Sequence, residues 1–185
     1  MSETVTDTVT VTVRRSGRTF DAEALLDLAA PAALVWQTIT DYPALPSFMP
    51  GIRACEVLDR RADGSTELLS VRQRGEFRFL VFAQSMTVEL QIEHRAPALA
   101  VARATRFDVG LLKTRALDVF EGRYALSPLP ASAGRPRTQL SYSARMVLRV
   151  PPPPGIGSMA VKQNLSAQLH AVAREVARRV AHAPA

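Results

Sequence analysis

Hydrophobic and polar positions alternate along much of the chain, which is the period of β-strands with one buried face. From Phe20 to Leu28 every second residue is apolar, and three of the four residues between them are acidic. The cleanest alternation runs from Met86 to Ile92, where Thr, Glu and Gln occupy the intervening positions. Strands with one buried and one solvent-exposed face are typical of antiparallel sheets. The sequence therefore predicts a first core strand over 20–28 and an antiparallel sheet after it.

A short amphipathic helix is predicted directly after the first core strand. Pro31 suits its first turn, because the amide proton that proline lacks would have no partner there. The segment DYPALPSFMPGI, residues 41–52, ends this helix, since a residue before proline is disfavoured in the helical region. Within it, 45–48 predicts one further short turn. The inward stripe of the helix consists of Leu34, Val35, Thr38 and Ile39.

Further runs with strand character follow, separated by turn signals. Asp63 and Gly64 predict a hairpin tip, and Gly75 predicts a bend near the middle of a long strand. A second hairpin is predicted near Gly110. The predicted strands are 52–58, 68–82, 86–92, 99–109, 114–126 and 138–150, with a surface loop over 128–136.

The proline-rich segment 151–157 predicts a stiff connector, because proline cannot donate the backbone hydrogen bonds of a sheet. A long helix is then predicted from Ser158 to about Ala181, since apolar residues recur there at spacings of three and four. Such a helix is roughly 36 Å long at 1.5 Å per residue, enough to cross a curved sheet. Its apolar stripe consists of Leu165, Leu169, Val172, Val176 and Val180.

This order of elements predicts an α+β fold, in which a curved antiparallel sheet of about six or seven strands wraps around the C-terminal helix. A chain of 185 residues suits one hydrophobic core. We expect a single domain over 18–183. Residues 1–17 contain an alternating Thr/Val stretch, which predicts either an edge strand or a frayed tail.

Composition narrows the possible partners. The net charge is +6, but the arginines are scattered rather than grouped, so no specific nucleic-acid partner is expected. The first residues lack the basic start and apolar run of a secretory signal, and no apolar run is long enough to span a bilayer, so a cytoplasmic location is expected. Cys55 is the only cysteine, and the three histidines have no metal-ligand spacing. Nucleotide-binding and hydrolase motifs are absent, so neither a metal nor a cofactor is expected.

Three features of the sequence belong together: the stretch PAALVWQTITDYPALPSFMPGI, the set Phe120, Gly122, Tyr124 and Leu126, and the proline connector with its terminal helix. Together they resemble the START-like (SRPBCC) superfamily, and more narrowly its polyketide cyclase/dehydrase and coenzyme Q-binding branch. The resemblance covers nearly the whole chain in element order and implies a helix-grip fold, whose sheet and helix enclose a cavity. It implies binding or transport of a hydrophobic small molecule such as a lipid, quinone or polyketide. The alternatives are an aromatase/cyclase or dehydratase acting in the same cavity, and a ribosome- or protein-interaction module.

The resemblance also suggests where a ligand would bind, because the turn after the first helix stands beside the cavity entrance in such a fold. Its aromatic and Met side chains either form a lid or fill the core between helix and sheet. Arg103 shares a strand face with apolar residues, which favours an inward charge. For Arg78 and Glu76 the period of two leaves open which face is inward. The expected ligand-binding residues are Tyr42, Phe48, Met49, Arg78, Arg103, Tyr142, Leu165 and Leu169, and no catalytic residue is identified.

Leu111 and Leu112 are predicted near a loop tip. We expect this pair either to pack over the cavity mouth or to make peripheral contact with a membrane or a partner protein.

Overall fold

The computed structural model describes residues 9–79, 82–110, 114–150 and 157–182. Its helical elements are α1 (Ala32–Thr40), the 3-10 turn η1 (Tyr42–Ala44), α2 (Leu45–Phe48) and α3 (Gly157–His182). Its strands are β1 (Val9–Ser16), β2 (Thr19–Leu28), β3 (Ile52–Asp63), β4 (Thr66–Phe79), β5 (Phe82–Arg95), β6 (Leu99–Val109), β7 (Thr114–Arg115), β8 (Leu117–Ser132) and β9 (Arg135–Leu148).

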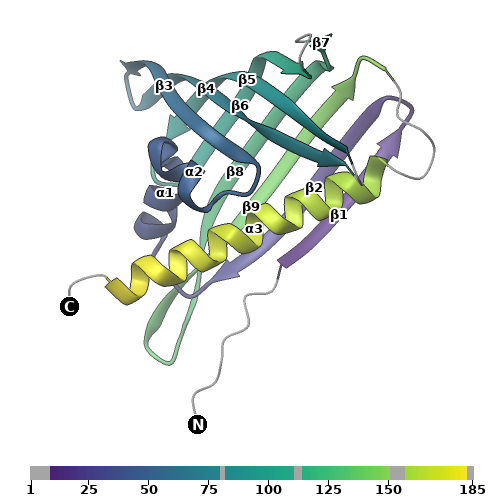
Figure 1. Ribbon diagram of the computed structural model, residues 1–185. Helices are drawn as coiled ribbons and strands as arrows, with labels where there is room; N and C mark the ends of the chain where they lie inside the picture. Colours follow the sequence, from purple (N-terminus) through teal and green to yellow (C-terminus); the bar gives the residue numbers. More distant parts are fainter. Residues whose placement is uncertain (1–8, 80–81, 111–113, 151–156, 183–185) are drawn as a thin grey trace.

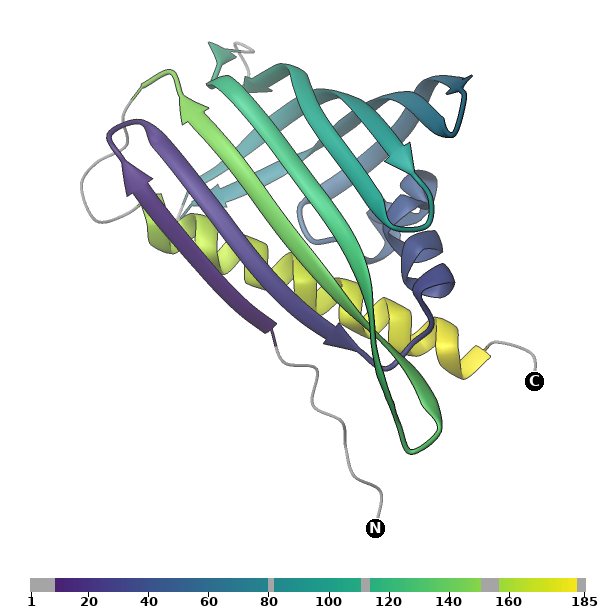
Figure 2. The same cartoon turned by 180° about the vertical axis from the view of Figure 1, so that it is seen from behind.

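The described strands form one antiparallel sheet in the order β1-β2-β9-β8-β6-β5-β4-β3, and the short β7 pairs with β6. The sheet curves strongly, and α3 crosses its concave side (Figures 1 and 2). The helices α1 and α2 lie at the edge of the concave side, beside the C-terminal part of α3. The predicted α+β helix-grip fold, with two short helices after the first core strand, is confirmed.

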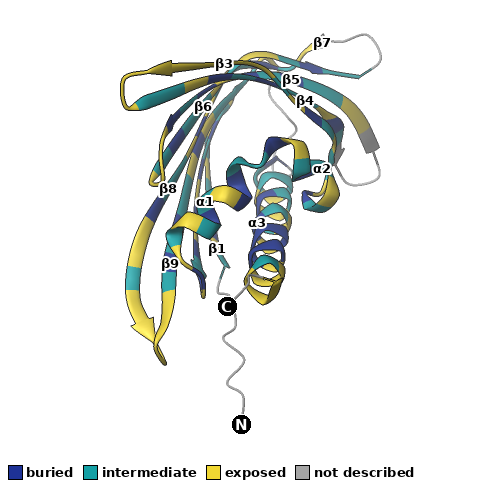
Figure 3. Cartoon of the chain, turned by 90° about the vertical axis from the view of Figure 1, so that its left-hand side faces the viewer, coloured by how far each residue is buried: buried dark blue, intermediate teal, exposed yellow. Residues whose placement is uncertain are grey.

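The core lies between the concave face of the sheet and α3, because alternate strand residues and one stripe of the helix are apolar. Phe20 and Leu26 of β2 and Leu169 and Val176 of α3 are almost fully buried. Burying one such side chain stabilises the fold by about 1.5–3 kcal/mol. Figure 3 shows α3 within the curve of the sheet, with exposed residues along β3 and at the far end of the β8–β9 hairpin.

Two glycines bring the turn after α2 against the sheet. The amide of Glu76 donates to the carbonyl oxygen of Gly51 at 2.8 Å. A Cβ atom on Gly75 would collide with the backbone of Gly51, so only glycine allows this approach. Gly51 itself has a φ of +83°, a conformation that favours glycine. Gly51 and Gly75 thus allow this turn to lie against β4.

The predicted surface loop over 128–136 is wrong, because β8 continues to Ser132 and β9 restarts at Arg135. The connecting Ala133 and Gly134 both have positive φ, as a tight hairpin turn requires. Pro128 and Pro130 are tolerated because β6 pairs with β8 only as far as Ala125, so no strand needs their missing amide protons.

The structure corrects one further strand prediction and decides between the two alternatives for the N-terminal stretch. The run 68–82 belongs to two strands, β4 and β5, rather than to one. Residues 9–16 pair with β2 as an edge strand. The connector 151–156 and the pair Leu111 and Leu112 lie outside the described residues. Among the helices that the structure describes, none has the length and apolarity needed to cross a bilayer.

Candidate functional site

A cavity of about 250 Å³ lies between the concave face of the sheet, the turn after α1 and the N-terminal half of α3. Its walls are mainly aliphatic and aromatic. From the sheet come residues such as Val88 and Phe120, from the turn Leu45 and Met49, and from α3 Val161. Such a concave, apolar space with a few polar groups is typical of small-molecule sites.

The cavity exists because a row of small residues crosses four neighbouring strands. In the strand register Ala22 of β2 lies opposite Ala144 of β9, Ala144 opposite Gly122 of β8, and Gly122 opposite Ala102 of β6. All four residues line the cavity. Their side chains are too short to reach α3, so the space between sheet and helix stays unfilled. Each of the four sits at an inward position of its strand, a signal that was present in the sequence.

The next row of the sheet carries polar side chains. Tyr142 of β9 lies opposite Tyr124 of β8, which lies opposite Ala100 of β6. Ala100 lies opposite His94 of β5, and His94 opposite Glu67 of β4. An apolar row and a polar row therefore run side by side across the floor of the site.

Tyr124 and Tyr142 form a pair of phenols on the cavity wall, with ring centroids 4.7 Å apart. Burial raises the pKa of Tyr124 to about 12, and burial also raises the pKa of Tyr142. Both hydroxyls are therefore protonated at neutral pH and can donate a hydrogen bond. Within the described part of the chain, neither hydroxyl has a hydrogen-bond partner. They are suited to a carbonyl or hydroxyl group of a ligand.

Tyr42, His94 and Glu67 form a hydrogen-bonded chain at one end of the cavity. The Tyr42 hydroxyl lies 2.7 Å from His94 Nε2, and His94 Nδ1 lies 3.2 Å from Glu67 Oε2. Burial is the main cause that lowers the pKa of His94, against the opposing hydrogen bond to Glu67. Burial also raises the pKa of Tyr42. His94 is only 4% exposed, and Tyr42 lines the cavity.

Neither His94 nor Glu67 was among the residues expected at the site, because the three histidines have no metal-ligand spacing and Glu67 belongs to no recognisable motif. His94 continues the inward alternation of Leu90 and Ile92, which was the available signal for its burial. Its meeting with Tyr42 needs the tertiary fold, because 52 residues separate them.

The structure brings four of the expected ligand-binding residues to the cavity: Tyr42, Met49, Tyr142 and Leu165. Phe48 packs against the core without lining the cavity, and Leu169 is 1% exposed in the core. The Arg78 side chain lies outside the described part. Glu76 lines the cavity and pairs with Arg53 at 3.1 Å.

Arg103 is a correction, because it points away from the cavity. It lies on the outer face, more than half exposed, and pairs with Glu121 at 2.8 Å. The prediction assumed regular alternation along this strand, which places Arg103 on the same face as Phe107, four residues later. A register shift between β5 and β6 leaves Thr105 without an opposite residue, and this bulge exchanges the faces of the strand. Phe107 therefore lines the cavity whereas Arg103 does not.

Cys55 is buried in the core, and burial raises its pKa to about 11. A protonated, buried thiol is a poor nucleophile, so Cys55 is not suited to nucleophilic catalysis.

Comparison with known proteins agrees with this geometry. A START superfamily protein from Mycobacterium smegmatis superposes with a TM-score of 0.68 at 19% identity, covering 85% of this chain and 97% of that one. The Zhui aromatase/cyclase from Streptomyces sp. R1128 gives 0.61 at 21% identity, covering 88% and 96%. A STAR-related lipid transfer protein from Xanthomonas axonopodis gives 0.61 at 15% identity, covering 91% and 93%. At these identities the likeness establishes the fold.

No curated protein matches the sequence significantly. The sequence does match one family, described as polyketide cyclase / dehydrase and lipid transport, over residues 28–173. This match spans α1, the strands β3 to β9 and most of α3, which together supply most of the cavity wall. The chain therefore belongs to the polyketide cyclase / dehydrase and lipid transport family.

Proposed function

We propose that the protein binds a compact, mainly apolar ketone or related ring compound in the cavity beneath α3. The observation that carries this proposal is the pair of phenol hydroxyls, Tyr124 and Tyr142, which face a mainly apolar space without protein partners in the described residues. Two such donors favour a ligand with a carbonyl group at that wall, because an unpaired polar group in a closed site is costly.

The size of the cavity limits the ligand. Pockets for small molecules usually measure roughly 300–1,000 Å³, and this one, at about 250 Å³, is below that range. A small fused-ring compound fits such a space better than a fully enclosed long-chain lipid. The family description names cyclase, dehydrase and lipid transport, and the size favours a ring compound among their ligands.

Isothermal titration calorimetry with 2-tetralone, a bicyclic ketone, tests this proposal. Tetralin is the matched compound without the carbonyl, and palmitate represents a long-chain lipid. We expect 2-tetralone to bind more tightly than both. Because one hydrogen bond contributes about 0.5–1.5 kcal/mol, Tyr142→Phe should weaken binding of 2-tetralone roughly twofold to tenfold and leave tetralin unchanged.

A variant that fills the cavity gives an independent test. Ala102→Leu should abolish binding of 2-tetralone, because Ala102 belongs to the row of small residues that creates the space. Ser143→Leu is the matched control, since Ser143 is exposed on the neighbouring outer face. Equal binding by the Ala102→Leu and Ser143→Leu variants, or tighter binding of palmitate than of 2-tetralone, would contradict the proposal.

A second function, catalysis in the same cavity, is favoured by one observation, the hydrogen-bonded chain of Tyr42, His94 and Glu67.

A further inference from the structure

We propose that Tyr42, His94 and Glu67 act as a proton relay that removes a proton from the carbon next to a ligand carbonyl. This inference rests on the proposed function, because it acts on a ketone bound in the cavity. It makes Tyr42 a catalytic residue, in contact with substrate, and His94 the group that holds the proton. Glu67 is then a positioning residue.

The three groups lead from the cavity to the protein surface. Tyr42 lines the cavity and is 5% exposed, whereas the Glu67 side chain is 36% exposed. Between them the His94 ring stacks on Tyr42 at 5.8 Å between centroids and meets the edge of Trp36 at 5.1 Å. These contacts fix the ring, so both nitrogens keep their partners. A base that is held rigidly is ready to act without reorganisation.

The partners of His94 determine the direction of proton transfer. Glu67 also pairs with Arg60 at 3.1 Å, as a carboxylate does, and a carboxylate only accepts hydrogen bonds. His94 Nδ1–H therefore donates to Glu67. Because burial disfavours the charged imidazole, Nε2 carries no proton and accepts from the Tyr42 hydroxyl. The Tyr42 oxygen keeps its lone pairs for a proton arriving from the cavity.

The step that follows is a balanced proton transfer. The carbon beside the ligand carbonyl loses its proton to the Tyr42 oxygen while Tyr42 passes its own proton to His94 Nε2. The C–H electron pair becomes the enolate, whose oxygen can accept hydrogen bonds from Tyr124 and Tyr142. The resulting imidazolium is paired with the Glu67 carboxylate. Return of the proton along the same path completes the cycle, and no further reactant is required.

A purely structural role explains this chain less well. A buried hydrogen-bonded pair contributes little net stability compared with aliphatic packing of the same shape. Neighbouring inward positions of β5 show that the site accepts aliphatic residues, since Val88, Leu90 and Ile92 are all buried there. The core therefore does not need a histidine at 94, whereas proton transfer does.

The electrostatic surroundings of the relay come from three strands. Glu67 of β4 and Arg60 of β3 act on His94, while Cys55 of β3 and Tyr124 of β8 act on Tyr42. Burial has the largest effect and disfavours the protonated imidazole, Glu67 favours it, and Arg60 opposes it. The net effect lowers the pKa of His94, so the base remains neutral until the pH falls below the ordinary range of histidine. Catalysis by the neutral base should accordingly persist below pH 6.5, the ordinary value for histidine.

The test is exchange of the C1 protons of 2-tetralone for deuterium in D₂O, followed by proton NMR. General-base catalysis contributes about 10²–10⁴-fold, so Tyr42→Phe should lower the exchange rate at saturation at least 100-fold. Its affinity for 2-tetralone should stay close to wild type, because the ring remains. Its thermal stability should fall, because Nε2 of the buried His94 loses its hydrogen-bond partner. Tyr142→Phe should instead weaken affinity as well as rate. Arg103→Ala is a control, because Arg103 lies exposed on the outer face and leaves the relay and its charged neighbours in place.

A second variant guards against misfolding of the Tyr42→Phe protein. Glu67→Gln alters only the partly exposed end of the relay. It should lower the exchange rate roughly tenfold, because the charge that stabilises the imidazolium is lost. Exchange by wild type no faster than in buffer, or unchanged rates in both variants, would overturn the relay and leave the binding proposal intact. Failure of wild type to bind 2-tetralone would overturn both.

Discussion

The two halves of α3 face the same sheet but meet different surroundings. The N-terminal half presents Val161, Asn164 and Gln168 to the cavity. From the middle of the helix onward, Leu169, Ala173 and Val176 are buried in the core and do not line the cavity. Along one helix, therefore, tight packing at one end allows an unfilled space at the other. Stability and ligand binding should separate along its length.

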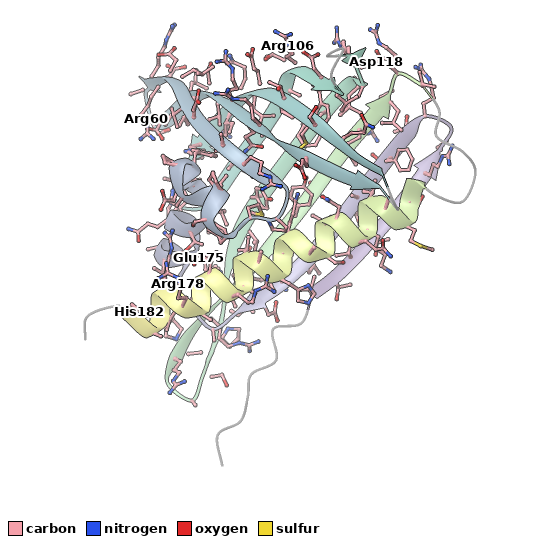
Figure 4. The ribbon with its side chains drawn as sticks, viewed as in Figure 1. Arg60, Arg106, Asp118, Glu175, Arg178 and His182 are labelled. Atoms are coloured by element: carbon pink, nitrogen blue, oxygen red, sulfur yellow. The ribbon has the colours of Figure 1, made fainter. Side chains whose placement is uncertain are left out.

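The closed end is also held by charged groups. Glu175 is buried and accepts hydrogen bonds from Arg178 and Arg179 at 2.7–2.8 Å. Arg179 also donates to Asp41 at the end of α1, at 2.9 Å. Figure 4 shows Glu175 and Arg178 near the C-terminal end of α3, on the side of α1. This cluster joins the two helices that close this end of the fold.

Leu169→Ala should produce the largest loss of stability. Truncating a fully buried leucine removes packing and leaves a void, which costs about 3 kcal/mol. Urea unfolding at pH 7 measures the free energy of unfolding. The affinity of this variant for 2-tetralone should stay within twofold of wild type, since Leu169 does not line the cavity. A loss below 1 kcal/mol would contradict the tight packing of the closed end.

Glu175→Gln should cost about 2 kcal/mol at pH 7. The two arginines lower the pKa of Glu175 to about 2, whereas a carboxyl of the unfolded chain titrates near 4.5. The unfolded state therefore binds the proton first as the pH falls, so this contribution is full above pH 4.5 and declines between pH 4.5 and 2. Unfolding curves of both proteins from pH 7 to pH 3 should converge. A constant difference would mean that charge is not the cause.

Val161→Ala should weaken ligand binding more than stability, which is the reverse of the effect expected for Leu169→Ala. Val161 is only partly buried, so the loss of stability should stay below about 1 kcal/mol. Its contact with the ligand should matter more, and affinity for 2-tetralone should fall severalfold in calorimetry. If the affinity is unchanged while stability falls as much as in Leu169→Ala, the two halves of α3 do not differ as proposed.

Arg103→Ala should have the smallest effect, because its ion pair with Glu121 is exposed on the outer face. Such pairs contribute at most about 0.5–1 kcal/mol. Unfolding and binding of 2-tetralone should both match wild type closely. A clear loss of binding would restore the inward orientation expected from the strand pattern.

Local patterns were sufficient for the fold. The alternation around Met86 and the spacing of three and four in α3 each report which side of an element is buried, so the element order followed from them. The β8–β9 hairpin beyond Pro128 was missed, because prolines in a sequence usually indicate a loop. They are compatible with a strand here because β6 does not pair with this part of β8, and the sequence does not show that. For the site, Tyr42 and Tyr142 could be selected by residue type and place.

The remainder of the site depends on register. One bulge reversed the orientation of Arg103, and no local pattern reports a bulge within a strand. The chain from Tyr42 through His94 to Glu67 joins a turn to two strands, so it becomes visible only when the strands are paired.

The edge strand β3 has a further consequence. The free edge of an open sheet is a template on which strands of other chains can assemble. In β3, register irregularities fall at Arg53 and Leu58, and the following Asp59, Arg60 and Arg61 are exposed. An incoming hydrophobic strand would meet an uneven ladder and unfavourable desolvation of charge. The stretch that supplies Arg60 to Glu67 thereby also protects the protein against aggregation in a crowded solution.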